Sequence, residues 1–357
     1  LNLIWVMPAE EVMTRSIRAW AAVLGLTLTL VSCGGDDDPG TITLLAHDSF
    51  APSDETLATF TAETGIEVEV LQAGDTGTMV AEAILTAGNP VADVLFGIDT
   101  TFLQRGLDAE LFAAHEATGI GSVPDELRLD DQNRVTPIDY GDVCVNYWID
   151  AIPGDVPGSL DDLVDPVNRG QLVVQNPETS SPGLAFLLAT IAAEGDAWEE
   201  FWSDLRANDV SVTAGWEDAY YGEFVAGDGL RSMVVSYASS PPAEVLFADP
   251  PVQEPPTAVV LDSCFRQVEF AGVLRGTDHE DEARQLIDFM LSPTFQEDLP
   301  LSMFVFPAVE GTPMPPEIVE HAEVPQDPLV LDPAESEATP DAWTERWVEI
   351  VWGGGAA

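Results

Sequence analysis

Short β-rich runs alternate with helix-like segments along the chain from Thr41 onward. This alternation is typical of α/β folds, in which helices cover largely parallel sheets. The 357 residues also exceed the roughly 250–300 residues at which a single hydrophobic core stops growing. We therefore predict an α/β protein with two lobes. The expected strands are 41–47, 67–72, 92–98, 135–148, 171–175, 210–213, 232–237 and 258–261, and the expected helices include 55–64 and 281–290.

The charge balance excludes some classes of partner. The chain has 63 acidic and 12 basic residues, a formal net charge of −51, and no lysine. Such a chain is repelled by nucleic acid and by anionic membrane surfaces. The acidity can reflect a solvated surface suited to salt, a compositional habit of the genome, or a field that attracts cationic ligands. Net charge alone does not separate these interpretations.

The N-terminal segment predicts export. Met13 is followed by Arg15 and Arg18 and then by an apolar run over 19–31. A run of about 13 residues is too short for a stable membrane-spanning helix and is typical of a signal peptide. We assign residues 13–32 to a lipoprotein signal peptide.

Cys33 directly follows the apolar run and resembles the cysteine of a bacterial lipobox, which is acylated and becomes the first mature residue. The alternative is an ordinary signal peptide with an incidental cysteine. The polar residues 33–40 are expected to form a flexible tether. These features predict an extracytoplasmic protein, in the periplasm or at the cell surface, that is anchored to the membrane by lipid.

Two cysteines remain in the mature chain, Cys144 and Cys264, each within a strand-like segment. An oxidising compartment allows a disulfide to persist. The sequence leaves open whether these residues are paired or are two buried thiols.

Several segments in one order and spacing carry a resemblance to a known family. They are 47–50 (HDSF), 92–99 (ADVLFGID), 139–141 (DYG), 176–183 (NPETSSPG), 215–220 (GWEDAY), 236–241 (SYASSP) and 292–296 (SPTFQ). Together they resemble the thiamine-binding periplasmic proteins, which are substrate-binding proteins of ABC transporters in the type II periplasmic-binding-protein superfamily. The resemblance runs along nearly the whole mature chain.

The resemblance implies two α/β lobes joined by crossing strands, with the ligand in the cleft between them. Lobe 1 would comprise 41–138 and lobe 2 would comprise 139–260, while 261–357 would return to lobe 1 and end in a helix docked there. The crossings would fall at 138–147 and near 261–270. Cys144 and Cys264 would then lie on adjacent crossings, which favours their pairing. The resemblance further implies a monomer that is not an enzyme, needs no cofactor or metal, and delivers its solute to an ABC permease and its ATPase.

Thiamine has a flat aminopyrimidine and a permanently cationic thiazolium, so its site needs an aromatic face and a carboxylate. Trp216 and Tyr237 suit the first need and Asp75 the second, although each also fits a role in the core or in a solvated loop. Ser180 and Ser181 precede an apolar helix and would cap it, or would hold the phosphate of a thiamine ester. The complete predicted ligand set is His47, Asp75, Thr76, Ser180, Ser181, Trp216, Tyr237, Ala238, Ser239 and Ser240.

This sequence departs from the family pattern at three of the positions around the expected site. His47 and Phe304 replace an aromatic residue and a tryptophan, and Ala243 replaces a tyrosine. The aromatic wall is therefore thinner than in the family.

Two other functions remain open. Tyr220-Tyr221 could bind ferric ion, as paired tyrosines do in related iron-binding proteins. An extracytoplasmic hydrolase is the alternative from another class, although the four histidines lie in no recognisable nucleophile or zinc motif. These histidines are His47, His115, His279 and His321.

Overall fold

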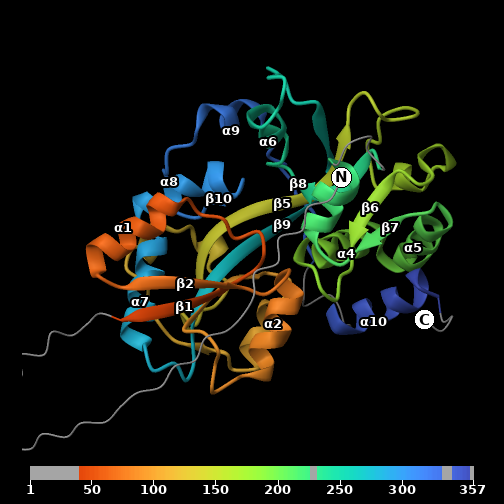
Figure 1. The fold of residues 1–357 in the computed structure, drawn as a ribbon. Coiled ribbons are helices and arrows are strands. Elements are labelled where there is room, and N and C mark those ends of the chain that lie inside the picture. The colour runs from red at the N-terminus through yellow and green to blue at the C-terminus, as the bar shows by residue number, and fades with distance from the viewer. Residues whose placement is uncertain (1–39, 226–230, 332–339, 354–357) are drawn as a thin grey trace, which may run out of the picture. The chain divides into compact units, whose positions relative to one another are not determined.

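Ten strands form one mixed sheet in the part of the chain that the structure describes. The structure is a computed structural model, and it describes residues 40–225, 231–331 and 340–353. The strand order is β2-β1-β3-β9-β5-β8-β6-β7, with β4 beside β9 and β10 beside β5 (Figure 1). The strands are β1 (Thr41–Ala46), β2 (Glu67–Gln72), β3 (Val94–Asp99), β4 (Phe112–Ala113), β5 (Thr136–Trp148), β6 (Leu172–Gln175), β7 (Ser211–Thr213), β8 (Met233–Tyr237), β9 (Thr257–Leu274) and β10 (Phe306–Pro307).

The predicted signal peptide 13–32, the lipidated Cys33 and nearly all of the tether 33–40 lie outside the described residues. Within the described ranges, none of the helices has both the length and the apolar character needed to cross a membrane.

The sheet has two parallel halves and an antiparallel centre. β1 pairs in parallel with β2 and β3, and β6 pairs in parallel with β7 and β8. Parallel neighbours need crossover connections, which the alternating helices supply, so the α/β expectation is confirmed in both halves. In the centre, β5 is antiparallel to β8 and β9, and β9 is antiparallel to β3.

The central strands β5 and β9 connect the two halves (Figure 1). They pair from Thr136 opposite Ala271 to Trp148 opposite Thr257. The expected crossings thus lie side by side, but the short strand expected at 258–261 and the crossing after it form one strand of 18 residues. Both predicted lobe boundaries fall within these strands and stay predictions.

Helices cover both halves of the sheet, and local sequence fixes where several of them begin and end. The Ser53 side chain accepts from the Thr56 amide at the start of α1, and Gly65, at φ 78°, ends it in the left-handed region. The α-helices are α1 (Asp54–Thr64), α2 (Thr76–Leu85), α3 (Leu103–Asp108), α4 (Ser181–Glu194), α5 (Trp198–Ala207), α6 (Pro241–Leu246), α7 (Glu280–Met290), α8 (Pro293–Ser302), α9 (Pro316–His321) and α10 (Pro340–Val351).

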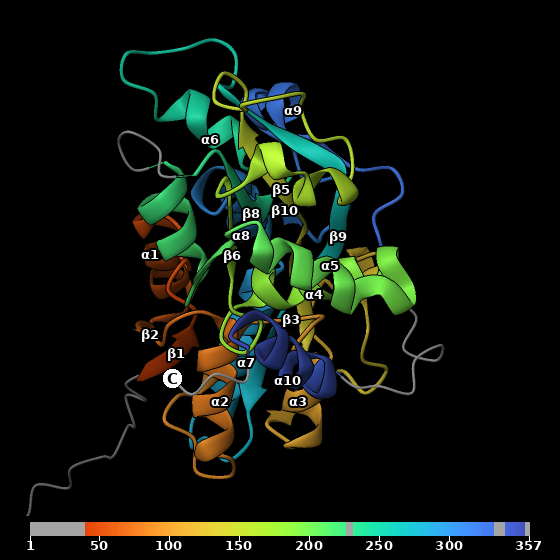
Figure 2. The ribbon, with the colours of Figure 1, turned by 90° about the vertical axis from the view of Figure 1, so that its right-hand side faces the viewer.

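The C-terminal helix α10 exists as predicted, but its expected docking on the first lobe is wrong. The fully buried Trp347 meets the ring of Trp202 on α5 edge to face at 5.4 Å. Arg206, also on α5, donates to the Ile350 carbonyl at 2.8 Å. α5 presents an apolar surface that covers the apolar stripe of α10 around Trp347, so α10 packs chiefly against α5. In the view of Figure 2, α10 lies between α5 and α3. Asp341 on α10 forms an ion pair with Arg105 on α3.

A disulfide joins the two central strands. Cys144 on β5 and Cys264 on β9 are both buried, with 4.2 Å between their Cα atoms. Of the two arrangements that the sequence leaves open, the structure has the paired one. The bond closes a loop across 120 residues of sequence and ties the strands on which both halves depend.

Replacing both Cys144 and Cys264 by alanine should lower the free energy of unfolding by about 2–4 kcal/mol, because the unfolded chain regains the entropy that the cross-link removes. Urea unfolding followed by tryptophan fluorescence measures this. Reductant should destabilise the parent protein similarly and leave the double variant unchanged. If reductant did not change the stability of the parent protein, and its mass indicated two free thiols, the disulfide would be contradicted.

Candidate functional site

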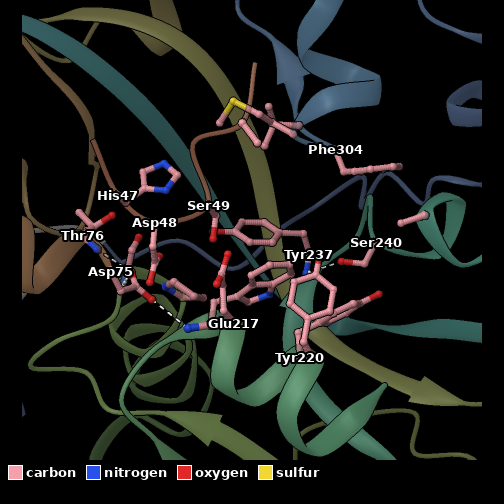
Figure 3. A pocket seen from close by; sticks show the side chains of 18 of the residues that line it. His47, Asp48, Ser49, Asp75, Thr76, Glu217, Tyr220, Tyr237, Ser240 and Phe304 are labelled. Carbon is pink, nitrogen blue, oxygen red and sulfur yellow. Dashed lines mark hydrogen bonds between the residues drawn. The ribbon is translucent and has the colours of Figure 1, made fainter. Parts of the chain in front are cut away.

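A cavity of about 270 Å³ takes its lining from both halves of the sheet (Figure 3). Segments that follow β1, β2, β6, β7 and β8 all contribute, so the cavity lies at the carboxyl ends of the parallel strands, where α/β proteins usually bind ligands. The lining residues are His47, Asp48, Ser49, Ala51, Asp75, Thr76, Ser181, Pro182, Trp216, Glu217, Tyr220, Tyr221, Tyr237, Ser240, Ala243, Phe247, Glu269, Ser302, Met303, Phe304 and Val305.

Seven of the ten predicted ligand residues line this cavity, and three do not. Ser180 is buried and caps α4 through the Gly183 amide. Ala238 packs against the disulfide, and the Ser239 hydroxyl donates to the Phe304 carbonyl at 2.5 Å. The structure brings together His47, Asp75, Thr76, Ser181, Trp216, Tyr237 and Ser240.

The Asp75 carboxylate connects the two halves of the chain. Its Oδ1 accepts from the Thr76 amide at 2.6 Å and from the Ser181 amide at 3.1 Å, and its Oδ2 accepts from the Trp216 amide at 3.0 Å. Thr76 begins α2, whereas Ser181 begins α4 and Trp216 follows β7. Asp75 thus occupies the N-terminal ends of two helices, where a negative charge is favoured.

Next to Asp75, the backbone of the first turn of α2 lies directly against the segment that precedes α4. The Thr78 amide donates to the Thr179 carbonyl at 3.3 Å. A Cβ on Gly77 would come within 2.7 Å of the Glu178 carbonyl oxygen, so glycine lets the first turn of α2 approach the segment before α4. Asp75, which the sequence analysis placed in a solvated loop or in the ligand site, therefore lines the cavity and also joins α2 to α4 and to the segment of Trp216. We call this set of contacts the Asp75 junction.

Trp216 is fixed in orientation by its neighbours. Its indole Nε1 donates to the Ser236 hydroxyl at 2.9 Å, and its ring stacks on Tyr220 at 4.8 Å with 20° between the planes. Tyr237 lies 6.5 Å away at a tilt, and its hydroxyl donates to Gln267 Oε1 at 3.2 Å. The cavity therefore has a preformed aromatic wall that needs little rearrangement to receive a flat ring.

His47 lies in the cavity wall beside Glu269. The distance from His47 Nε2 to Glu269 Oε1 is 3.1 Å, but the contact lacks hydrogen-bond geometry, so this buried nitrogen has no hydrogen-bond partner. Gly97, at φ 101°, makes room for the imidazole, because a Cβ there would lie 2.2 Å from His47 Cδ2. Burial lowers the pKa of His47, but Glu269, Asp75 and Asp48 outweigh burial and raise that pKa above its usual value.

Ser181 connects the cavity to a buried carboxylate. Its hydroxyl hydrogen bonds to Asp99 and receives a hydrogen bond from the Gln267 side-chain amide. Burial raises the pKa of Asp99 to about 6, against the opposing effect of the Ser181 and Thr101 hydrogen bonds. Asp99 is only 1% exposed, and its hydrogen bond holds the Ser181 side chain in place.

Several lining residues were missed from the sequence. Asp48 directly follows His47, and Glu217 directly follows Trp216. Their position next to predicted ligand residues is the signal in the sequence that could have identified them. Glu269 carried no signal, because it lies within the long strand β9. Ala243 and Phe304, noted as departures from the family, also line the cavity, as do the paired tyrosines Tyr220 and Tyr221.

The cavity carries excess negative charge. Its described lining includes four carboxylates, and His47 is the sole basic side chain among those residues. Burial, followed by the nearby Asp75, raises the pKa of Asp48, and burial, followed by Asp48, raises the pKa of Glu217. The carboxylates are Asp48, Asp75, Glu217 and Glu269. Within the described ranges, no group of three or more His, Cys, Asp or Glu side chains is arranged to hold a metal ion.

Replacing Asp75 by alanine should lower the free energy of unfolding by about 1–3 kcal/mol, because partly buried amides lose their acceptor. Urea unfolding measures this, with Asp108→Ala, at an exposed α3 position, as the matched control. An equal free energy of unfolding in the parent and in Asp75→Ala would contradict a stabilising role for the hydrogen bonds of Asp75.

Asp99 should make the folded protein less stable as pH rises from about 4 to about 6. Its pKa is raised from 3.8 to about 6 in the folded state, so the folded state binds more protons than the unfolded state in this window. Urea unfolding of the parent and Asp99→Asn across this range isolates the effect. The parent should lose stability relative to the variant as pH increases, and a constant difference would contradict the raised pKa.

Comparisons with known proteins agree on the class of protein. Residues 89–336 match the bacterial extracellular solute-binding protein family. The chain is 29% identical over 315 residues to a thiamine-binding periplasmic protein of Escherichia coli strain K12, covering 87% of this chain and 93% of that protein. It is also 24% identical over 336 residues to iron uptake protein A1 of Synechocystis, and this match covers 88% of this chain and 91% of that protein.

A solved structure described as a periplasmic thiamin binding protein superposes with a TM-score of 0.78 at 27% identity, covering 87% of this chain and 96% of that one. Its similarity extends over both halves of the sheet and supports the two-lobed periplasmic-binding-protein fold. The family match covers more than half of the chain. The chain therefore belongs to the bacterial extracellular solute-binding protein family, whose members are substrate-binding transport proteins rather than enzymes.

Proposed function

We propose that this protein is an extracytoplasmic solute-binding lipoprotein of an ABC importer and that its solute is thiamine. The observation that supports this most is the cavity itself, in which an oriented indole adjoins carboxylates and the described lining has no arginine. The similarity to thiamine-binding periplasmic proteins along 87% of the chain points to the same ligand.

The chemistry of thiamine matches the cavity at both ends of the molecule. Trp216 offers a ring face for the aminopyrimidine or the thiazolium, and Tyr237 offers a second aromatic surface. The buried Nε2 of His47 lies 3.1 Å from Glu269 without hydrogen-bond geometry, so it can turn to hydrogen bond to a pyrimidine nitrogen of the ligand. Asp48 and Glu217 supply negative charge for the cationic ring.

The transport cycle follows from lining residues in both halves of the chain. Thiamine that contacts residues from both halves of the sheet would stabilise a closed arrangement of the two lobes and present a surface to the permease. Lipid on Cys33 and the tether 33–40 would hold the protein at the membrane as a monomer. These assignments extend the family function to this chain.

The ferric-iron alternative has less support. Tyr220 and Tyr221 do line the cavity, and a relative is an iron uptake protein. However, the Tyr220 hydroxyl donates to Glu244 at 2.8 Å, and its ring stacks on Trp216. Burial, followed by Glu244, raises the pKa of Tyr220 well above its usual value, which opposes formation of a phenolate ligand. The hydrolase alternative conflicts with the family assignment.

Calorimetric titration of the untagged mature protein with thiamine should give saturable binding at one site. Trp216→Ala should weaken this binding by about 1–3 kcal/mol, because a stacking surface is lost. Trp352→Ala is the matched control, since Trp352 is 47% exposed and does not line the cavity. Absence of thiamine binding, with a purple charge-transfer band on adding ferric ion, would favour iron instead.

A further inference from the structure

We propose that the carboxyl groups of Asp139 and Glu269 share one proton in the ligand-free protein, and that a cationic ligand entering the cavity releases this proton to solvent. The shared proton follows from the arrangement of the central strands β5 and β9. Its release rests on the proposed function, because it requires a ligand with a positive charge.

Asp139 on β5 and Glu269 on β9 are directly opposite each other in the antiparallel pairing of the two strands. Side chains at opposite positions of an antiparallel pair point to the same face, with their Cβ atoms about 4.5–5.5 Å apart. The two carboxyl groups are within hydrogen-bonding reach of each other. Two like charges at such positions destabilise the strand pair, and a proton between them removes this repulsion.

Asp139 is enclosed by the protein. The residue is 1% exposed, and among the described residues no donor reaches its Oδ2. On β10, the residue opposite Asp139 is Pro307, which has neither an amide hydrogen nor a polar side chain. An ionised carboxylate here would lack compensation, whereas a carboxylic acid can donate its own hydrogen to Glu269. Burial, followed by the charge of Glu269 and the hydrogen bond to it, raises the pKa of Asp139 well above its usual value.

The charged groups around the pair do not replace this proton. His47, which follows β1, lies 3.1 Å from Glu269, so its positive charge, when present, compensates one carboxylate of the two. Asp99, at the end of β3, and Asp75, at the start of α2, act on the same cluster with further negative charge. The surroundings therefore favour retention of a proton by the pair.

The remaining neighbours bring no positive charge to Asp139. Tyr237 on β8 is neutral, because burial raises its pKa well above the usual value. The arginine of β9, Arg266, forms an ion pair with Asp142 at 2.5 Å. Residues 181–182 at the start of α4 and 306–307 of β10 have no titratable side chain.

Glu269 connects the pair to the ligand. It lines the cavity, whereas Asp139 is not among the lining residues. A cation beside Glu269 favours the ionised form of both carboxyl groups, because opposite charges attract strongly where water is largely excluded. The O–H bond of the pair then breaks, the proton passes through the cavity to solvent, and the pair carries two negative charges in place of one. Cation binding and proton release are therefore coupled, and each promotes the other.

Calorimetric titration in buffers of different ionisation enthalpy, at about pH 7 to 8, counts the protons released with thiamine. Asp99, whose pKa is about 6, is largely ionised at this pH. The parent should release about one proton per thiamine, and its affinity should rise by up to about tenfold per pH unit. Asp139→Asn, which has the shape of the protonated acid, should bind thiamine without this release. Asp108→Asn, at an exposed position of α3, is the matched control and should release as the parent does.

Difference infrared spectra identify the group that loses the proton. On adding thiamine, the parent should lose the C=O band of a protonated carboxyl group and gain carboxylate bands, a change that proton loss from His47 would not produce. The protonated band should be present in the ligand-free parent at the same pH and absent from Asp139→Asn. Glu269→Gln removes the other half of the pair and should also abolish the release, so it replaces Asp139→Asn if that variant does not fold.

The outcomes separate this inference from the proposed function. Thiamine binding without proton release, or with a release that persists in Asp139→Asn and Glu269→Gln, would overturn the coupling and leave the proposed function in place. Absence of thiamine binding would overturn the proposed function and the coupled release, while the ligand-free spectrum would still decide on the shared proton. A ligand-free parent without the protonated carboxyl band would overturn the shared proton itself.

Discussion

The Asp75 carboxylate accepts hydrogen bonds from three backbone amides, and these amides come from both halves of the chain. It therefore fixes α2 relative to α4 and to the segment that carries Trp216. Because the cavity is lined by these same segments, its shape depends on this junction. Asp75 also neutralises the helix N-terminus that would otherwise attract an anion, so one side chain shapes both the architecture of the site and its charge.

The central strands supply the second constraint. β5 and β9 connect both halves of the sheet, and the disulfide between Cys144 and Cys264 ties them at a buried position. Cavity residues lie on or beside these strands, as Glu269 on β9 does. A binding protein of this family needs lobes that can move and a connection that endures, and paired strands with a covalent link meet the second need.

Much of the fold follows from local sequence. The buried run of β3 and the helix start of α4 were predictable, because strand composition, helix caps and periodicity act over a few residues. The docking of α10 was not, since an apolar stripe such as that of Trp347 specifies burial but no partner. In the site, Trp216 and Asp75 were identified through the family resemblance. Glu269 was not, because its place in the cavity comes from the pairing and path of β9, which no local pattern encodes.

We propose that an oriented aromatic wall and a cluster of carboxylates together bind a flat organic cation. The decisive experiment is a crystal structure of the protein grown with thiamine. We expect electron density for the ligand in the cavity, with one of its rings lying against the indole of Trp216 and its cationic ring nearest Asp48 or Glu217. A ligand bound elsewhere, or a ligand in the cavity whose rings make no contact with the indole of Trp216, would contradict this mode of binding.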